Sequence, residues 1–148
     1  MRGYGLGEPT LDDGAYLKKD FFTYPTFVAE NTTLAGNAST TSTFNVDGDS
    51  DFFWTKFAYF AMDNDGAFVA SPLVDIVVTD TTSGRDLMSS QVPLTSIGGT
   101  GQLPFILPVE RFIAAKSTIK VSYYNVGAVT LSRLRLSFIG IKAFKRTP

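Results

Sequence analysis

The chain has 148 residues and a formal net charge of −1 from 13 basic and 14 acidic side chains, and it contains neither cysteine nor histidine. Their absence excludes disulfides, thiol nucleophiles, histidine-dependent catalysis and most zinc sites. The near-neutral charge gives no general attraction to nucleic acids, so no nucleic-acid partner is expected. A chain of this length can bury roughly 68–70% of its unfolded surface, which is enough for one self-sufficient core.

Residues 1–30 combine many glycines and prolines with recurring aromatic side chains. One interpretation is an irregular segment packed along its own domain. The other is an extended arm that anchors on a neighbouring subunit, because interface cores favour aromatic residues. We predict an extended N-terminal arm over 1–30 and a β-sandwich domain over 31–148. The predicted partner-binding residues of the arm are Tyr16, Phe21, Phe22, Tyr24 and Phe27.

The first eight residues have no apolar stretch of the kind found in a signal peptide, so we expect synthesis in the cytoplasm of the producing cell. No apolar run approaches the roughly 20 residues of a membrane-spanning helix, so no membrane partner is expected.

An acidic turn carries Asp47, Asp49 and Asp51 at alternate positions, as at the start of a calcium loop. The sixth position of an EF-hand loop needs glycine, and here it is Phe52. An EF-hand is therefore excluded, and a looser calcium site or a plain acidic turn before a strand remain the alternatives.

The middle of the chain reads as strands separated by turns. Asn31–Thr43 is polar and suits a linker, an edge strand or a loop. Strict alternation along a strand at Phe52–Met62 places Trp54 with Lys56 on one face and Phe53 with Phe57 on the other.

Three further segments follow this strand. Leu73–Asp80 is predicted as a strand with Val74, Ile76 and Val78 inward, because they alternate with other residues. Leu87–Ser90 is predicted as a short strand, and Gln91–Gln102, with its proline and glycines, as a long loop.

The C-terminal third holds the clearest alternation. In Thr118–Tyr124 the inward set is Ile119, Val121 and Tyr123, and in Ser132–Phe144 it is Leu134, Leu136 and Phe138. Asn125-Val126-Gly127 between them predicts a hairpin. The number and spacing of the strands favour an all-β fold, a two-sheet antiparallel β-sandwich of jelly-roll type.

Arg133 and Arg135 alternate with the inward residues and belong to a basic C-terminal third. They could contact carboxylates of a partner chain, bind phosphates, or form a solvated face that discourages aggregation. We take the partner contact and add both arginines to the predicted partner-binding residues. No catalytic residue, cofactor or metal site is expected.

Four segments of this third resemble a pattern found in small virion structural proteins of tailed bacteriophages. They are Leu103–Pro108, Ser117–Val121, Asn125 and Leu134–Lys142. The resemblance implies a β-sandwich of the capsid decoration (cement) or collar type, without catalysis or cofactor. It implies binding to the major capsid protein or other virion proteins, commonly as a homo-oligomer, and a location in the virion.

We therefore predict a decoration protein that stabilises contacts between capsid subunits. One alternative is a collar, portal-associated or tail component. Another is a carbohydrate-binding β-sandwich for host attachment, with exposed aromatic platforms beside carboxylates. The candidate platforms are Trp54, Tyr59, Tyr123 and Tyr124.

Overall fold

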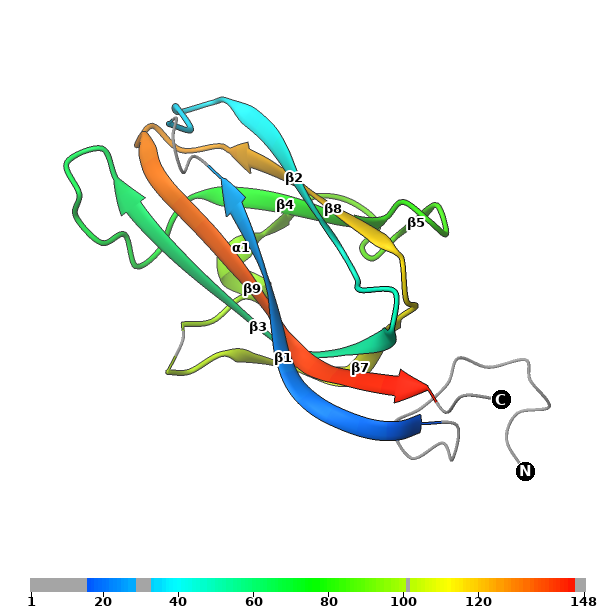
Figure 1. Cartoon of the computed structure of the whole chain (residues 1–148). Coiled ribbons are helices and arrows are strands. Elements are labelled where there is room, and N and C mark those ends of the chain that lie inside the picture. The colour runs from blue at the N-terminus through cyan, green and yellow to red at the C-terminus, as the bar shows by residue number, and fades with distance from the viewer. Residues whose placement is uncertain (1–15, 29–32, 101, 146–148) are drawn as a thin grey trace.

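The computed structural model describes residues 16–28, 33–100 and 102–145. It consists of two packed β-sheets and one short helix (Figure 1). The strands are β1 (Tyr16–Val28), β2 (Ser39–Asn45), β3 (Ser50–Asp63), β4 (Val74–Asp80), β5 (Arg85–Asp86), β6 (Val92–Pro93), β7 (Phe105–Ile113), β8 (Thr118–Asn125) and β9 (Leu131–Lys145). The helix, α1 (Leu94–Ile97), lies between β6 and β7.

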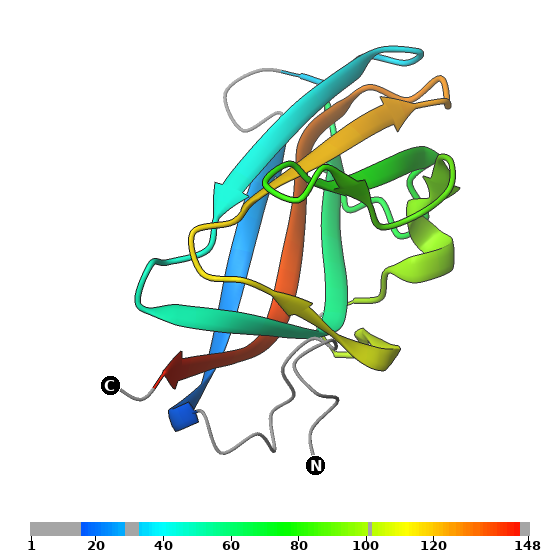
Figure 2. The ribbon, with the colours of Figure 1, turned by 90° about the vertical axis from the view of Figure 1, so that its right-hand side faces the viewer.

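The strand order identifies the topology. One sheet has the order β1-β9-β3-β7 and the other the order β2-β8-β4-β5, with β6 beside β4. Most successive strands cross from one sheet to the other, and all the pairings are antiparallel (Figure 2). The eight strands other than β6, divided in this way between two sheets, form a jelly roll. The predicted fold class is confirmed.

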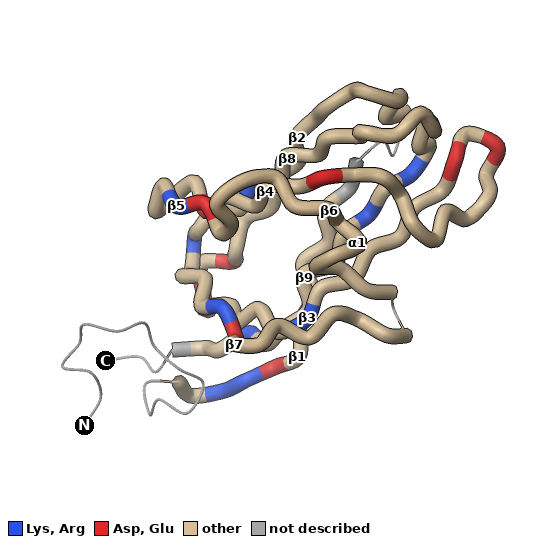
Figure 3. Tube along the Cα trace, turned by 180° about the vertical axis from the view of Figure 1, so that it is seen from behind, with Lys and Arg blue, Asp and Glu red and all other residues tan. Residues whose placement is uncertain are grey.

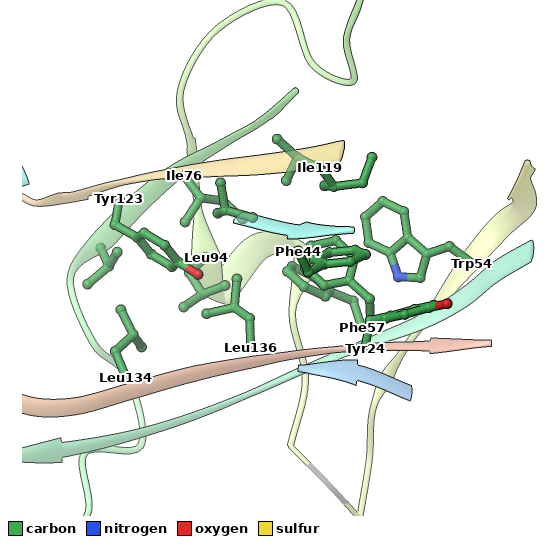
Figure 4. Packing of buried hydrophobic residues seen from close by; sticks show 14 of the residues in the cluster. Tyr24, Phe44, Trp54, Phe57, Ile76, Leu94, Ile119, Tyr123, Leu134 and Leu136 are labelled. Atoms are coloured by element: carbon green, nitrogen blue, oxygen red, sulfur yellow. The ribbon is translucent and has the colours of Figure 1, made fainter. Parts of the chain in front are cut away.

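The core lies between the sheets and is built from alternate residues of the facing strands (Figure 4). As predicted, the inward side chains expected on β4, β8 and β9 are all buried: Val74, Ile76, Val78, Ile119, Val121, Tyr123, Leu134, Leu136 and Phe138. Each such large apolar side chain stabilises the fold by about 1.5–3 kcal/mol.

The predicted faces of β3 are wrong because the strand contains a bulge. The register with β9 and with β7 shifts between Trp54 and Lys56. An extra residue reverses the alternation beyond it, so Trp54 and Phe57 both point into the core while Lys56 is exposed.

The predicted hairpin after β8 is also wrong. β8 pairs with β2 and β4, whereas β9 pairs with β1 and β3, so the chain crosses between sheets here. The buried Asn125 holds this crossing: its amide donates to the carbonyls of Leu34 and Val129, and its side-chain oxygen accepts from the Gly127 N–H. In a hairpin, such backbone groups would bond to the opposite strand. Here the side chain of Asn125 provides the partners for the Leu34 and Val129 carbonyls and the Gly127 amide.

Residues 16–28, which lie within the predicted arm, form strand β1 at the edge of the first sheet. They pair with β9 of the same chain from Tyr16 to Val28. The strand is held by its inward side chains, of which Tyr24 stacks on Phe44 at 5.1 Å and meets the edge of Phe52 at 4.9 Å. The other predicted arm residues, 1–15 and 29–30, lie outside the described part of the chain.

For three segments with weaker sequence patterns, the strand pairing shows which structure they adopt. The polar segment before β3 contains β2, an edge strand that begins at Ser39. The strand predicted at Leu87–Ser90 does not form, because β4 pairs with Arg85–Asp86 instead. The predicted loop 91–102 contains β6 and α1. In the described part of the chain, no helix has the length and hydropathy needed to cross a membrane.

Candidate interaction surface

The outer face of the β1-β9-β3-β7 sheet carries rows of apolar side chains that run across the strands. Phe21, Ile141, Phe53 and Phe112 are register neighbours on the four strands. Phe53 is fully buried, whereas Phe21 at the β1 edge is 77% exposed. One end of the row is therefore covered and the other is open.

A small second core covers the Phe53 end of this face. The Tyr16 ring meets the edge of Phe53 at 5.6 Å, and its hydroxyl donates to Asp51 Oδ2 at 2.8 Å. The Ala115 N–H donates to Asp51 Oδ1 at 2.9 Å. The buried carboxylate is thus held by two donors, and Tyr16 is engaged within its own domain.

The next row along the strands combines apolar and cationic side chains. Thr23, Ile139, Lys56 and Ile106 are register neighbours, and Ile106 is 66% exposed. Aliphatic groups and an ammonium thus lie side by side on the solvent face.

At the far end, the Phe60 and Phe68 rings lie 5.8 Å apart beside a shallow depression of about 480 Å³. Arg135 and Ser137 line the same depression, and Arg133 is the register neighbour of Met62 beyond it. Figure 3 shows basic residues along β1, β3 and β9. We call this surface the apolar-cationic face; its members are Phe21, Lys56, Phe60, Phe68, Ile106, Arg133, Arg135, Ile139 and Ile141.

The structure separates the predicted partner-binding residues into two groups. Phe21 and Arg133 are exposed and Arg135 is half-buried, all on the apolar-cationic face. Along β9, Arg133 lies eight residues from the neighbour of Phe21, which is about 27 Å in an extended strand.

The second group of predicted anchors is packed within the chain's own domain, Tyr16 in the small second core and Tyr24 and Phe22 against the main core. Tyr16 and Tyr24 are buried, and Phe22 is half-buried with its ring 4.8 Å from that of Tyr24. Phe27 belongs to β1 by its backbone, and its side chain lies outside the described part.

Sequence reasoning missed Phe60, Phe68, Ile106 and Lys56 as members of the face. Phe60 was hidden by the bulge, because its position decides which side of β3 faces outward. Phe68 lies beyond the end of β3 and joins the face through its bridge to Met62 and its ring contact with Phe60. Ile106 lies in the proline-bracketed run, whose pairing with β3 also depends on that bulge.

The three acidic residues of the turn before β3 do not converge. Lys142 Nζ lies 2.7 Å from Asp47 Oδ2 and 4.0 Å from Asp49 Oδ1, whereas Asp51 turns toward Tyr16. The hydrogen bond to Asp47 raises the pKa of Lys142. Across 16–28, 33–100 and 102–145, no three His, Cys, Asp or Glu side chains are grouped as a metal site.

Two of the four candidate sugar platforms lie inside the molecule and two are half-buried. Trp54 and Tyr123 are buried, and burial raises the pKa of Tyr123 to about 12. The Tyr59 hydroxyl donates to the Ala70 carbonyl at 2.8 Å. Tyr124 is half-buried on the outer face of the second sheet, where its register neighbour is Asp75. Tyr124 beside Asp75 is therefore the arrangement that fits a sugar platform.

No family model matches the chain, and no curated protein matches its sequence. Among solved structures, a similar chain occurs in the crystal structure of the infectious bursal disease virus VP2 subviral particle, with a TM-score of 0.31 and 12% sequence identity. The match covers 96% of this chain and 42% of that chain, so this chain spans less than half the length of that neighbour. The fold assignment rests on the strand order and not on this likeness.

Proposed function

We propose that the chain is a non-enzymatic structural protein of a bacteriophage particle, a capsid decoration protein that binds the assembled shell through the apolar-cationic face. Jelly rolls occur in viral capsid proteins, but also in lectins and cupins. Because a fold does not determine function, the proposal rests on the surface and on the sequence resemblance described above.

The observation that carries the proposal is the open end of the apolar-cationic face. Phe21 is 77% exposed, its register neighbour Ile141 is half-buried, and the cations Lys56 and Arg133 lie on the same face. Large exposed apolar patches mark interaction sites, and aromatic and arginine side chains are enriched in interface cores. A protein partner whose contact surface is apolar with acidic groups would complement this face.

The mechanism of a decoration protein is linkage. A protein that binds only the assembled shell lowers the free energy of the shell by mass action, so the particle withstands more heat. Binding in the virion, after synthesis in the host cytoplasm, needs no catalysis or cofactor.

The test combines particle binding with copy number. Wild-type protein is expected to co-sediment with the shell at a copy number comparable to that of the major shell protein and to raise the temperature of shell disruption. Phe21→Ser and Arg133→Glu should each lower this binding without changing the thermal unfolding of the isolated chain. Matched controls are Val126→Ser, which removes an exposed apolar side chain from the β8–β9 connection, and Lys120→Glu on the other sheet.

The outcomes separate the alternatives. Saturation at a small fraction of the shell protein would assign the chain to the collar, portal or tail. Equal loss of binding in the controls would remove the apolar-cationic face from the proposal, and no association with particles would overturn it.

The pair Tyr124 and Asp75 favours carbohydrate binding as the second candidate function, because a tyrosine beside a carboxylate can stack on a sugar ring and accept bonds from its hydroxyls. A glycan array with wild type and Tyr124→Ala tests it, since only a sugar-binding protein would give signals that the variant loses.

A further inference from the structure

A small apolar pocket opens between the two sheets, on the side where β7 and β5 form their edges. Trp54 and Phe57 of β3 line it, with Met88 from the connection between β5 and β6, Ile97 of α1 and Leu107 of β7. Its volume is about 150 Å³. An engineered cavity of that size with a similar apolar lining stays dry and binds benzene, so this pocket has room for one six-membered ring.

Backbone and side-chain hydrogen bonds fix the walls of the pocket. The Gly99 N–H donates to Phe57 O at 3.1 Å, and the Tyr59 N–H donates to Gly99 O at 2.8 Å, which fastens the end of the α1 segment to β3. The Leu87 N–H donates to Val78 O at 2.8 Å, and Trp54 Nε1 donates to Lys56 O at 2.8 Å. The pocket is therefore preformed, as ligand sites usually are.

Among the described residues that line this pocket, Arg111 supplies the only charged side chain. It is half-buried and is the register neighbour of Trp54 across β3 and β7. Within the described ranges, no carboxylate forms an ion pair with the Arg111 guanidinium and no acceptor takes a hydrogen bond from this guanidinium. A guanidinium beside apolar walls is matched best by a carboxylate, which accepts two parallel N–H bonds.

We propose that this pocket binds a small planar apolar molecule that carries one carboxylate, with its ring against Trp54 and Phe57 and its carboxylate on Arg111. The proposal is independent of the virion role and of the apolar-cationic face, because none of its residues belongs to that face. It gives the Arg111 guanidinium a binding partner, which the described part of the fold does not provide.

The single tryptophan of the chain makes the test direct. In a two-dimensional 1H–15N NMR spectrum the one indole N–H signal belongs to Trp54 and reports on the pocket. We would titrate the full chain with benzoate and, separately, with benzamide, its neutral isostere. Benzoate should shift the indole signal saturably and bind about tenfold more tightly than benzamide, because bonds to charged groups are stronger than neutral ones.

Variants then separate charge from shape. Arg111→Met should reduce benzoate binding to the level of benzamide, while benzamide binding persists and shows that the pocket is intact. Ile97→Phe should fill the pocket and abolish both. Arg133→Met, which removes an exposed cation elsewhere on the surface, should change neither.

The comparison of benzoate with benzamide on the wild-type chain needs no variant, so the proposal can still be tested if Arg111→Met misfolds. Arg111→Lys is a second substitution, which keeps the positive charge but loses the planar guanidinium. Equal affinity for benzoate and benzamide, shifts that avoid the indole, an unchanged benzoate affinity in Arg111→Met, or no binding of either probe would each overturn the proposal.

Discussion

Gly140 on β9 lies opposite the bulge of β3. A Cβ atom built on it would overlap the carbonyl oxygen of Phe53 and press on the Phe52 ring. Because a backbone carbonyl cannot move aside without breaking the ladder, we expect Gly140→Ala to lower the free energy of unfolding by about 3 kcal/mol. Urea denaturation measures this loss. Ser137→Ala, on the same strand, is the control, and an equal effect there would contradict the bulge as the cause.

Tyr123 is a buried acid whose ionisation the fold opposes. Its hydroxyl lies 2.6 Å from Thr26 Oγ1 across the two sheets, and burial raises its pKa to about 12 from the ordinary 10.0. Above pH 10 the unfolded chain releases this proton while the folded chain retains it. The free energy of unfolding should therefore fall by about 1.4 kcal/mol per pH unit from this residue as pH rises from 10 toward 12.

Urea titrations at several pH values between 9 and 12 check this expectation. Tyr123→Phe should be less stable than wild type near pH 8, where it lacks the bond to Thr26, and should lose less stability over the alkaline range. Tyr124→Phe, a neighbour on the outward side of β8, is the control for tyrosine loss. Parallel pH profiles for wild type and Tyr123→Phe would contradict the assignment.

The turn from β2 to β3 is fastened to β9 by Lys142. The side chain of Lys142 is 10% exposed, and it lies 4.3 Å from the Phe22 ring centroid and 2.7 Å from Asp47 Oδ2. We expect Asp47→Asn to lower the free energy of unfolding by about 1 kcal/mol, discounted because Asp47 is half-exposed. Thermal and urea unfolding at pH 7 measure the loss.

Asp49→Asn is the matched control, since Asp49 lies 4.0 Å from Lys142 and is more exposed. Its cost should stay below about 0.5 kcal/mol. The pKa of Lys142 is raised, so the ion pair contributes fully below the unfolded pKa of 10.5 and is lost as pH rises through the higher folded pKa. The difference between wild type and Asp47→Asn should vanish in that alkaline range, and a difference that persists there would contradict the ion pair.

The elements that could be predicted from sequence are those in which alternation alone decides the face. β4, β8 and the first half of β9 have uninterrupted alternation, and their inward residues are those expected. The prediction for the faces of β3 was wrong because the extra residue at Trp54–Lys56 cannot be seen in the sequence pattern, since both faces of that strand are apolar. The prediction of a hairpin after β8 was wrong for another reason. The residues after β8 tolerate a tight turn, but the pairing of β9 with β1 and β3 depends on strands that are distant in the sequence.

The candidate surface was predictable in part for the same reason. Arg133 and Arg135 lie on a regularly alternating strand, so their outward direction followed from sequence. The outward position of Phe60 depends on the bulge, and that of Phe68 depends on a contact between its loop and Phe60. The position of Arg111 in the pocket depends on the pairing of β7 with β3 at Trp54. None of these long-range pairings has a local signal.

The position of β1 decides whether the sandwich is formed by one chain or shared between two copies. It pairs with β9 of the same chain, so the sandwich is complete within one copy. The alternative is an exchanged β1 strand that occupies the same position on a neighbouring copy, which a strand at a sheet edge permits. The chain has no cysteine, so an engineered pair reports on this without background.

Thr23 and Ile139 are register neighbours whose side chains both face outward. The double variant Thr23→Cys with Ile139→Cys, treated with a short bis-maleimide, should cross-link within one chain, because opposed Cβ atoms in an antiparallel pair are about 4.5–5.5 Å apart. A non-reducing gel and intact mass should show the monomer mass plus one linker. Equal amounts of the two single variants, unfolded and refolded together, should give no linked heterodimer. Efficient linkage in that mixture would show an exchanged strand, and the apolar-cationic face would then be formed by two copies.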